Sequence, residues 1–152
     1  MKPTSALPLG PASLDPSPHE LPVAGMSAQL GFPSPAEDFL DDGIDLHRWL
    51  VARPSATYLY RACGHSMVGA GILDGDLLVV DRSVQPQSGD IVIATWDGQQ
   101  PSCKFYLPST EHVCLRAADQ HTPDICLRDI EIEVFAVVGI ARRMRRNHVR
   151  TG

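Results

Sequence analysis

Hydrophobic residues after Pro54 occur in short runs that predict β-strands. Val, Ile, Leu, Tyr and Phe are concentrated in these runs, and Gly, Asp, Pro and Gln separate them. The predicted strands cover residues 56–62, 76–81, 90–96, 103–107, 112–117 and 133–144. This pattern predicts a mostly β fold with a core of antiparallel strands.

Two short helices are predicted before this β region. Residues 34–37, Ser-Pro-Ala-Glu, form a capping box with proline at the first helical position. The first helix is therefore expected over residues 35–41, ending near Gly43. The second is expected over residues 45–51, because Pro54 disfavours a longer one.

Eight of the 13 prolines lie in the first 35 residues, without any hydrophobic period. Such a segment is expected to be an extended, mobile arm that holds no regular ladder of hydrogen bonds. The predicted organisation is a removable arm, a short helical linker, a β domain and a basic tail. These four parts cover residues 1–30, 31–53, 54–146 and 147–152.

Charge and cysteine content limit the partners and the compartment. The net charge is −5, although five of the 11 arginines lie between Arg142 and Arg150. No helix-turn-helix pair is predicted, so sequence-specific DNA binding is not expected. The four cysteines show no CxxC spacing, and no signal peptide or stretch of about 18 apolar residues is present. Reduced thiols, a cytoplasmic location and no membrane anchor are therefore expected.

Ser66, in the stretch CGHSMVGAGILDGDLLVVD (63–81), is a candidate nucleophile. The stretch lacks the second glycine of the G-x-S-x-G elbow, which excludes an α/β-hydrolase. His65 cannot be its base, because adjacent residues of an extended chain point to opposite faces. His47, His112 and His121 remain alternatives as the base.

Lys104 is the alternative base and, apart from Lys2, the chain's only lysine. It lies in the predicted strand SCKFYL, where its side chain must either reach solvent or occupy a site that lowers its pKa. A desolvated, neutral lysine can take the proton of a serine hydroxyl, which arginine cannot do. The residues alone leave both roles of Lys104 open.

Three segments in this order, GHSMVGAGILDGDLLVVD, SGDIVIATWDG and CKFYL, resemble the LexA/UmuD family of self-cleaving serine-lysine peptidases, peptidase family S24. Residues 31–58 resemble its UmuD branch in particular, whose members are accessory subunits of translesion DNA polymerases. The resemblance covers residues 31–144. It implies a β core like those of LexA and signal peptidase.

By this resemblance, Ser66 is the nucleophile, Lys104 is the general base, and the backbone N–H groups of Ser66 or Met67 hold the oxyanion. The bond that is cut is Leu30-Gly31. Leu30 is larger than the Ala or Cys usual before the glycine, which is expected to slow cleavage. Ala24-Gly25 is the alternative bond.

The lysine strand departs from the family pattern by one extra residue within residues 99–102. A gapless match would place Cys103 at the position of the base. Only Lys104 can fill this role, because a cysteine could not take the proton in the same way. Asp74 and Asp76 belong to a turn that leads into a strand, and no metal or other cofactor is assigned to them.

The resemblance also implies partners and a role in the SOS response. These partners are a second copy of the chain, a RecA-ssDNA filament that stimulates cleavage, and a UmuC-type Y-family DNA polymerase. Signal peptidases need a membrane anchor and LexA-type repressors need a DNA-binding domain, and neither is expected from this sequence. The alternative function is a non-catalytic, dimeric polymerase-docking module in which Ser66 and Lys104 are relics.

Overall fold

The structure is a computed structural model of the 152-residue chain, and it describes residues 5–12, 20–21 and 43–144. The helix expected over residues 35–41, both candidate cleavage bonds and the basic tail lie outside the described residues. In the described part, no helix is both long enough and apolar enough to cross a membrane.

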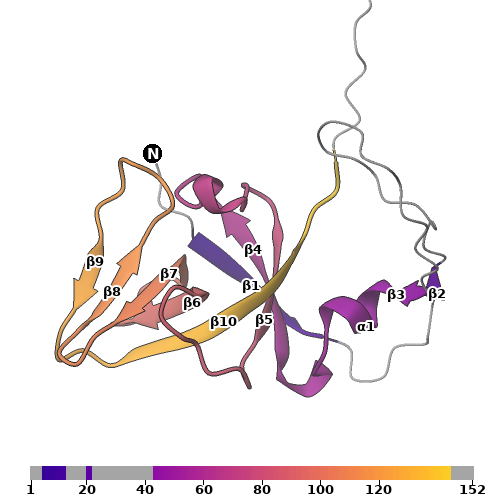
Figure 1. Cartoon of the computed structure of the whole chain (residues 1–152), viewed down its shortest axis with the longest axis horizontal. Coiled ribbons are helices and arrows are strands. Elements are labelled where there is room, and N and C mark those ends of the chain that lie inside the picture. The colour runs from indigo at the N-terminus through magenta and orange to yellow at the C-terminus, as the bar shows by residue number, and fades with distance from the viewer. Residues whose placement is uncertain (1–4, 13–19, 22–42, 145–152) are drawn as a thin grey trace, which may run out of the picture.

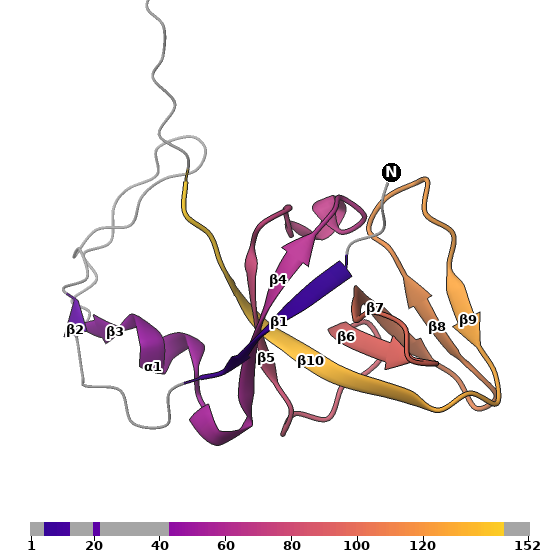
Figure 2. The same ribbon diagram turned by 180° about the vertical axis from the view of Figure 1, so that it is seen from behind.

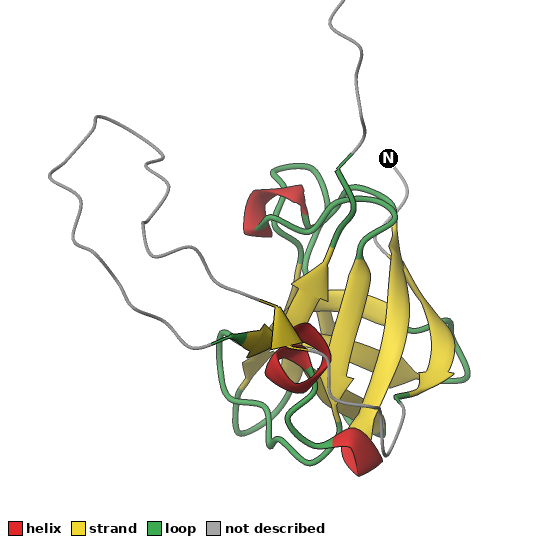
Figure 3. Cartoon of the chain, turned by 90° about the vertical axis from the view of Figure 1, so that its right-hand side faces the viewer, coloured by secondary structure: helices red, strands yellow, loops and turns green. Residues whose placement is uncertain are grey.

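Eight antiparallel strands form one sheet in the order β1-β4-β5-β10-β6-β7-β8-β9. They are β1 (Ser5–Pro11), β4 (Thr57–Cys63), β5 (Leu77–Asp81), β6 (Ile91–Trp96), β7 (Ser102–Pro108), β8 (Val113–Arg116), β9 (Ile125–Leu127) and β10 (Ile132–Ala141). Because β1 also pairs with β7, the sheet closes into a barrel-like body (Figures 1 and 3). The predicted mostly β fold with an antiparallel core is confirmed.

The remaining elements are short. They are β2 (Glu20–Leu21), β3 (Ile44–Asp45), helix α1 (Leu46–Leu50) and two 3₁₀ turns, η1 (Pro54–Ala56) and η2 (Val68–Ala70). Helix α1 confirms the helix expected over residues 45–51, and its N-cap is Asp45, which accepts a hydrogen bond from the Arg48 N–H at 3.2 Å. The short strands β2 and β3 were not predicted.

The hydrophobic core has two parts, and β6 contributes to both. Ile93 packs with Tyr60, Met67 and Cys103 in one cluster. Val92 and Ala94, which point the other way, pack in the second. A strand that is buried on both faces needs a continuous hydrophobic run, which explains why residues 90–96 show little alternation.

The expectation that the proline-rich arm holds no hydrogen-bonded ladder is wrong for β1. Its residues pair with β4 from Ser5, opposite Cys63, to Pro11, opposite Tyr58. The register shifts between Pro8 and Gly10, which is typical of a bulge. Proline has no backbone N–H to donate, but the residues between the prolines do. The strand therefore tolerates proline where no N–H is needed for the pairing.

The expectation of four reduced thiols is also wrong, because Cys114 and Cys126 form a disulfide. These residues lie directly opposite each other on β8 and β9, where side chains of an antiparallel pair are close. Since β9 was not predicted, the sequence did not show that these cysteines are neighbours. Cys63 and Cys103 are free thiols.

Candidate active site

Ser66 lies in a tight turn between the end of β4 and η2. Gly64 has a φ of 97°, a conformation that favours glycine, and its N–H donates to the Asp74 carboxylate at 2.8 Å. The next side chain after the serine, Met67, is fully buried in the core. The turn and this anchor hold Ser66 in place with only 1% of its surface exposed.

The serine turn is also fastened to the segment that follows β8. The Ala118 N–H donates to the Ser66 carbonyl at 2.7 Å, and the Gly69 N–H donates to the Ala118 carbonyl at 3.0 Å. A Cβ at Gly69 would lie 2.3 Å from that carbonyl oxygen, so glycine is required by close approach of the backbone. No feature of the sequence indicated this role of Ala118.

Lys104 reaches Ser66 from strand β7. Its side chain is completely buried, and its Nζ donates to Ser66 Oγ at 3.2 Å and to the Cys103 carbonyl at 3.1 Å. The sequence left open whether this side chain reaches solvent or lies in a site that lowers its pKa. In the structure the side chain is buried and does not reach solvent. The two residues that resemblance assigned as nucleophile and base lie within hydrogen-bond distance, although 38 positions separate them.

Burial lowers the pKa of Lys104 from its ordinary value of 10.5, while the charge of the Asp119 carboxylate, and that of Cys103 when it is a thiolate, act in the opposite direction. The Cys103 thiol is itself buried, which raises its pKa to about 12, so it stays protonated at neutral pH. The environment thus favours a neutral amine on Lys104. Such an amine can accept a proton from the Ser66 hydroxyl at the observed separation. Sequence reasoning missed Asp119.

The histidine alternatives have other surroundings. His112 Nδ1 lies 3.2 Å from Ser109 Oγ, and His47 is part of α1. His121 follows β8 and donates its backbone N–H to Asp119. Among the candidate bases, Lys104 is shown with a hydrogen bond to Ser66, and Cys103 belongs to the hydrophobic core.

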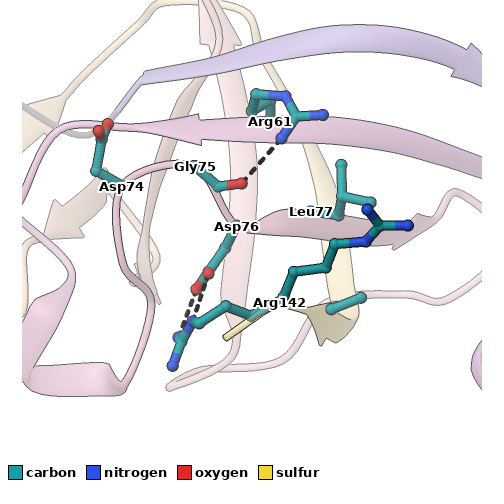
Figure 4. A pocket seen from close by; sticks show the side chains of 8 residues that line it. Arg61, Asp74, Gly75, Asp76, Leu77 and Arg142 are labelled. Carbon is teal, nitrogen blue, oxygen red and sulfur yellow. Dashed lines mark hydrogen bonds and ion pairs between the residues drawn. The ribbon is translucent and has the colours of Figure 1, made fainter. Parts of the chain in front are cut away.

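Asp76 and Asp74 brace the serine turn. The buried Asp76 carboxylate accepts two hydrogen bonds of 2.6 Å from Arg142 (Figure 4). Arg142 also donates to the Gly71 carbonyl at 2.7 Å. The hydrogen bond from Arg142 is the main reason why the pKa of Asp76 lies below its ordinary value. A pocket of about 640 Å³ surrounds these groups, and neither Ser66 nor Lys104 lines it. Both carboxylates have structural partners here, in agreement with their expected place in a turn.

One cluster of metal-ligand types occurs in the part of the chain that the structure describes. The ligand atoms of His112, Cys114 and Cys126 lie within 4.8 Å of one another. Because the two sulfur atoms are bonded to each other, they do not offer thiolates to a metal in this state.

Comparison with known proteins connects this geometry to a family. The family model described as "Peptidase S24-like" matches residues 22–140. Protein ImpA of Salmonella typhimurium is 51% identical over 78 residues, which are 51% of this chain and 54% of ImpA. Protein MucA of Escherichia coli is 45% identical over 76 residues, covering 50% of this chain and 52% of MucA.

A LexA repressor, that of Caldicellulosiruptor saccharolyticus, is 34% identical over 124 residues, which are 82% of this chain and 59% of the repressor. The chain thus spans about half the length of ImpA and MucA in these matches. The match to the family model is longer than the matches to ImpA and MucA. It includes Ser66, Lys104 and most of the strands around them.

Proposed function

Because this chain belongs to the peptidase S24-like family, we propose that it cleaves its own N-terminal arm with Ser66 as nucleophile and Lys104 as general base. The observation that carries the proposal is the 3.2 Å contact between Lys104 Nζ and Ser66 Oγ, two buried polar groups. Burying a charged lysine is costly, so a fully buried lysine favours the neutral form and is a candidate for a functional role. Membership of a peptidase family supports a catalytic role.

In the proposed reaction, neutral Lys104 takes the proton of the Ser66 hydroxyl while Oγ attacks the carbonyl carbon of Leu30. Backbone N–H groups of Ser66 or Met67 stabilise the oxyanion of the tetrahedral intermediate. The bond to Gly31 breaks, and the protonated Lys104 gives its proton to the leaving amine. Water then attacks the Ser66 ester, which releases the carboxylate of Leu30 and restores the hydroxyl.

The arm is long enough to reach the serine. About 35 residues separate Gly31 from Ser66, and an extended chain covers roughly 3.3 Å per residue. Cleavage within one chain and cleavage between two copies are both compatible with this length.

The proposed role after cleavage is in the SOS response. A RecA-ssDNA filament would stimulate the reaction in the cytoplasm, and the trimmed homodimer would serve a UmuC-type Y-family polymerase in translesion synthesis. Support comes from the resemblance of residues 31–58 to the UmuD branch and from the similarity to ImpA and MucA. A non-catalytic docking module is the second candidate, and the Ser66–Lys104 contact favours the catalytic one.

The direct test is incubation of the purified protein with and without a RecA-ssDNA filament, at pH 7 and pH 10. Mass spectrometry then locates any new N-terminus. A trimmed product supports the peptidase, and its increase with the filament supports the SOS role. An intact chain under all four conditions would favour the docking module.

We expect the new N-terminus to be Gly31-Phe32-Pro33-Ser34. A glycine after the cut leaves room for the chain to bend into the site, whereas the larger Leu30 before it slows the reaction. Leu30→Ala is therefore expected to cut at least as fast as the wild type, as measured by the rate of product formation. A product that begins at Gly25 would move the site to Ala24-Gly25, and markedly slower cleavage of Leu30→Ala would indicate a pocket shaped for leucine.

Gly69→Ala is expected to slow cleavage at least about tenfold, because the added Cβ pushes the serine turn away from Ala118 and displaces Ser66 from Lys104. Gly98→Ala is the control. Gly98 has a φ of 66° and open space around its Cβ position, so this substitution adds backbone strain of about 1 kcal/mol far along the chain from the serine. Equal cleavage rates for the two variants would contradict the role given to Gly69.

A further inference from the structure

Strand β1 lies between the two strands that position the catalytic pair. It runs beside β4 (Figure 2) and pairs with it antiparallel along its length. Its first residue also pairs with β7, so Ser5 lies opposite both Cys63 and Ser102. The Ala6 N–H also donates to the Pro101 carbonyl at 2.9 Å. Among the described strands, β4 and β7 are joined through β1 and do not pair with each other.

The contact residues of β1 are close to the catalytic pair along the chain. Cys63 comes three residues before Ser66, and Ser102 comes two residues before Lys104. At roughly 3.3 Å per residue, the two partners of Ser5 therefore lie within about 10 Å of the serine and about 7 Å of the lysine along the chain, and the spacing between strands adds about 5 Å to the distances from Ser5. A peptide held in extended form between β4 and β7 near this pair would meet Ser5 and Ala6, whichever direction it runs.

Few side chains of β1 are buried, although its backbone pairs with β4 along the whole strand. Ala6 is its anchor, with 1% of its surface exposed in the cluster that also contains Ala62, Met67 and Cys103. In contrast, Leu7 and Leu9 are 47% and 50% exposed. Pro8 and Pro11 have no N–H to donate, and the register shift after Pro8 interrupts the ladder. Such a strand is more easily displaced than the central strands of the barrel.

We infer that the space between β4 and β7 is a binding site for an extended peptide with a small side chain at the position of Ala6, and that residues 5–11 are its resident, inhibitory occupant. The side chain must be small because Ala6 is enclosed by core residues. Main-chain hydrogen bonds to two strand edges provide the affinity, as in other cases of strand addition. The inhibitory part rests on the proposed self-cleavage, whereas the binding part does not.

Under this inference, the segment to be cut reaches Ser66 only while β1 is away from its site. The observed rate is then the intrinsic rate multiplied by the fraction of molecules in which the site is open. Cleavage at Leu30-Gly31 removes β1 together with the arm, so the trimmed chain keeps the site without its resident strand.

The inhibitory part is tested with Ala6→Asp in the full chain, which places a charge at an enclosed position and releases β1. Leu7→Asp, with the same charge on the exposed side of the same strand, is the matched control. We expect self-cleavage at pH 10 to be at least about fivefold faster in Ala6→Asp and unchanged in Leu7→Asp. An unchanged or slower rate in Ala6→Asp, with the variant folded and the wild type active, would overturn the inhibitory role.

The binding part is tested without catalysis, in a Ser66→Ala background that also carries Ala6→Asp. A labelled synthetic peptide of residues 1–12 is the probe, and fluorescence anisotropy measures its binding. We expect the native peptide to bind at least about tenfold more tightly than the same peptide with Asp at position 6. Equal affinities, or no binding of either peptide, would overturn the binding site.

One further variant and the peptide-binding result separate the possible causes of failure. Ala6→Gly removes only a methyl group and replaces Ala6→Asp as the test if that variant unfolds the barrel. We expect Ala6→Gly to accelerate cleavage less than a folded Ala6→Asp would. If no variant cleaves, including the wild type, the proposed peptidase function fails, while the peptide-binding result still decides whether the site between β4 and β7 exists.

Discussion

Ser66→Ala and Lys104→Ala are each expected to abolish self-cleavage, with a loss of at least about 10³-fold, and to leave the fold intact. In the proposed mechanism both residues act in one proton transfer, so the loss of either stops the reaction, and the double variant should be no slower than the single ones. Lys104 Nζ and Ser66 Oγ are 3.2 Å apart and buried, which leaves water little access as a substitute base. Mass spectrometry of the intact and trimmed chains measures the loss.

Lys104→Met separates catalysis from folding. Methionine fills a similar volume without an amine that must be desolvated, so the substitution removes the cost of burying a polar group. We therefore expect Lys104→Met to be inactive but at least as resistant to urea as the wild type at pH 7. Lys104→Arg should also be inactive, because arginine keeps its proton. Normal cleavage by Lys104→Ala at neutral pH would remove Lys104 from the mechanism.

Much of the barrel could be predicted because its central strands are continuous hydrophobic runs bounded by turn residues. Strands β5 and β6 are of this kind, and both are found within one residue of the predicted bounds. Strand β9 is only three residues long and lies in a segment with few hydrophobic residues. Its pairing depends on β8, and no local pattern indicates such a contact.

Strand β1 shows how tertiary structure overrides local composition. Prolines at positions 8 and 11 argue against a ladder, yet a single buried alanine and two neighbouring strand edges are enough to hold the segment in the sheet. The edges belong to β4 and β7, which are about 40 residues apart in the sequence. Periodicity within the arm carries no information about that partnership.

Part of the candidate site could be predicted from the sequence, because two of its residues stand out locally. Ser66 and Lys104 could be singled out because one lies in a distinctive turn and the other is a lone lysine in a hydrophobic strand. Their contact and the burial of Lys104 could be seen only in the folded structure. The fastening of Ser66 by Ala118 involves only backbone groups, which any residue could supply, so residue identity could not predict it.

The second large effect expected is on the pH dependence of cleavage. Only the neutral form of Lys104 can act as base, and burial is the main reason why its pKa lies below 10.5. Below that lowered pKa, the neutral fraction and hence the rate rise about tenfold per pH unit. The rate should therefore increase steeply from pH 7 and level off before pH 10.5.

Stability measurements at each pH show whether the acceleration has this cause. Between the lowered pKa of Lys104 and 10.5, the unfolded chain binds more protons than the folded one, so this lysine makes the fold more stable as pH rises. The Cys103 thiol, with a pKa raised from 9.0 to about 12, has the opposite effect above pH 9. We therefore expect the rate to rise between pH 7 and 9 without a loss of urea resistance. A bell-shaped profile centred near pH 6.5 would instead point to His47, His112 or His121 as the base.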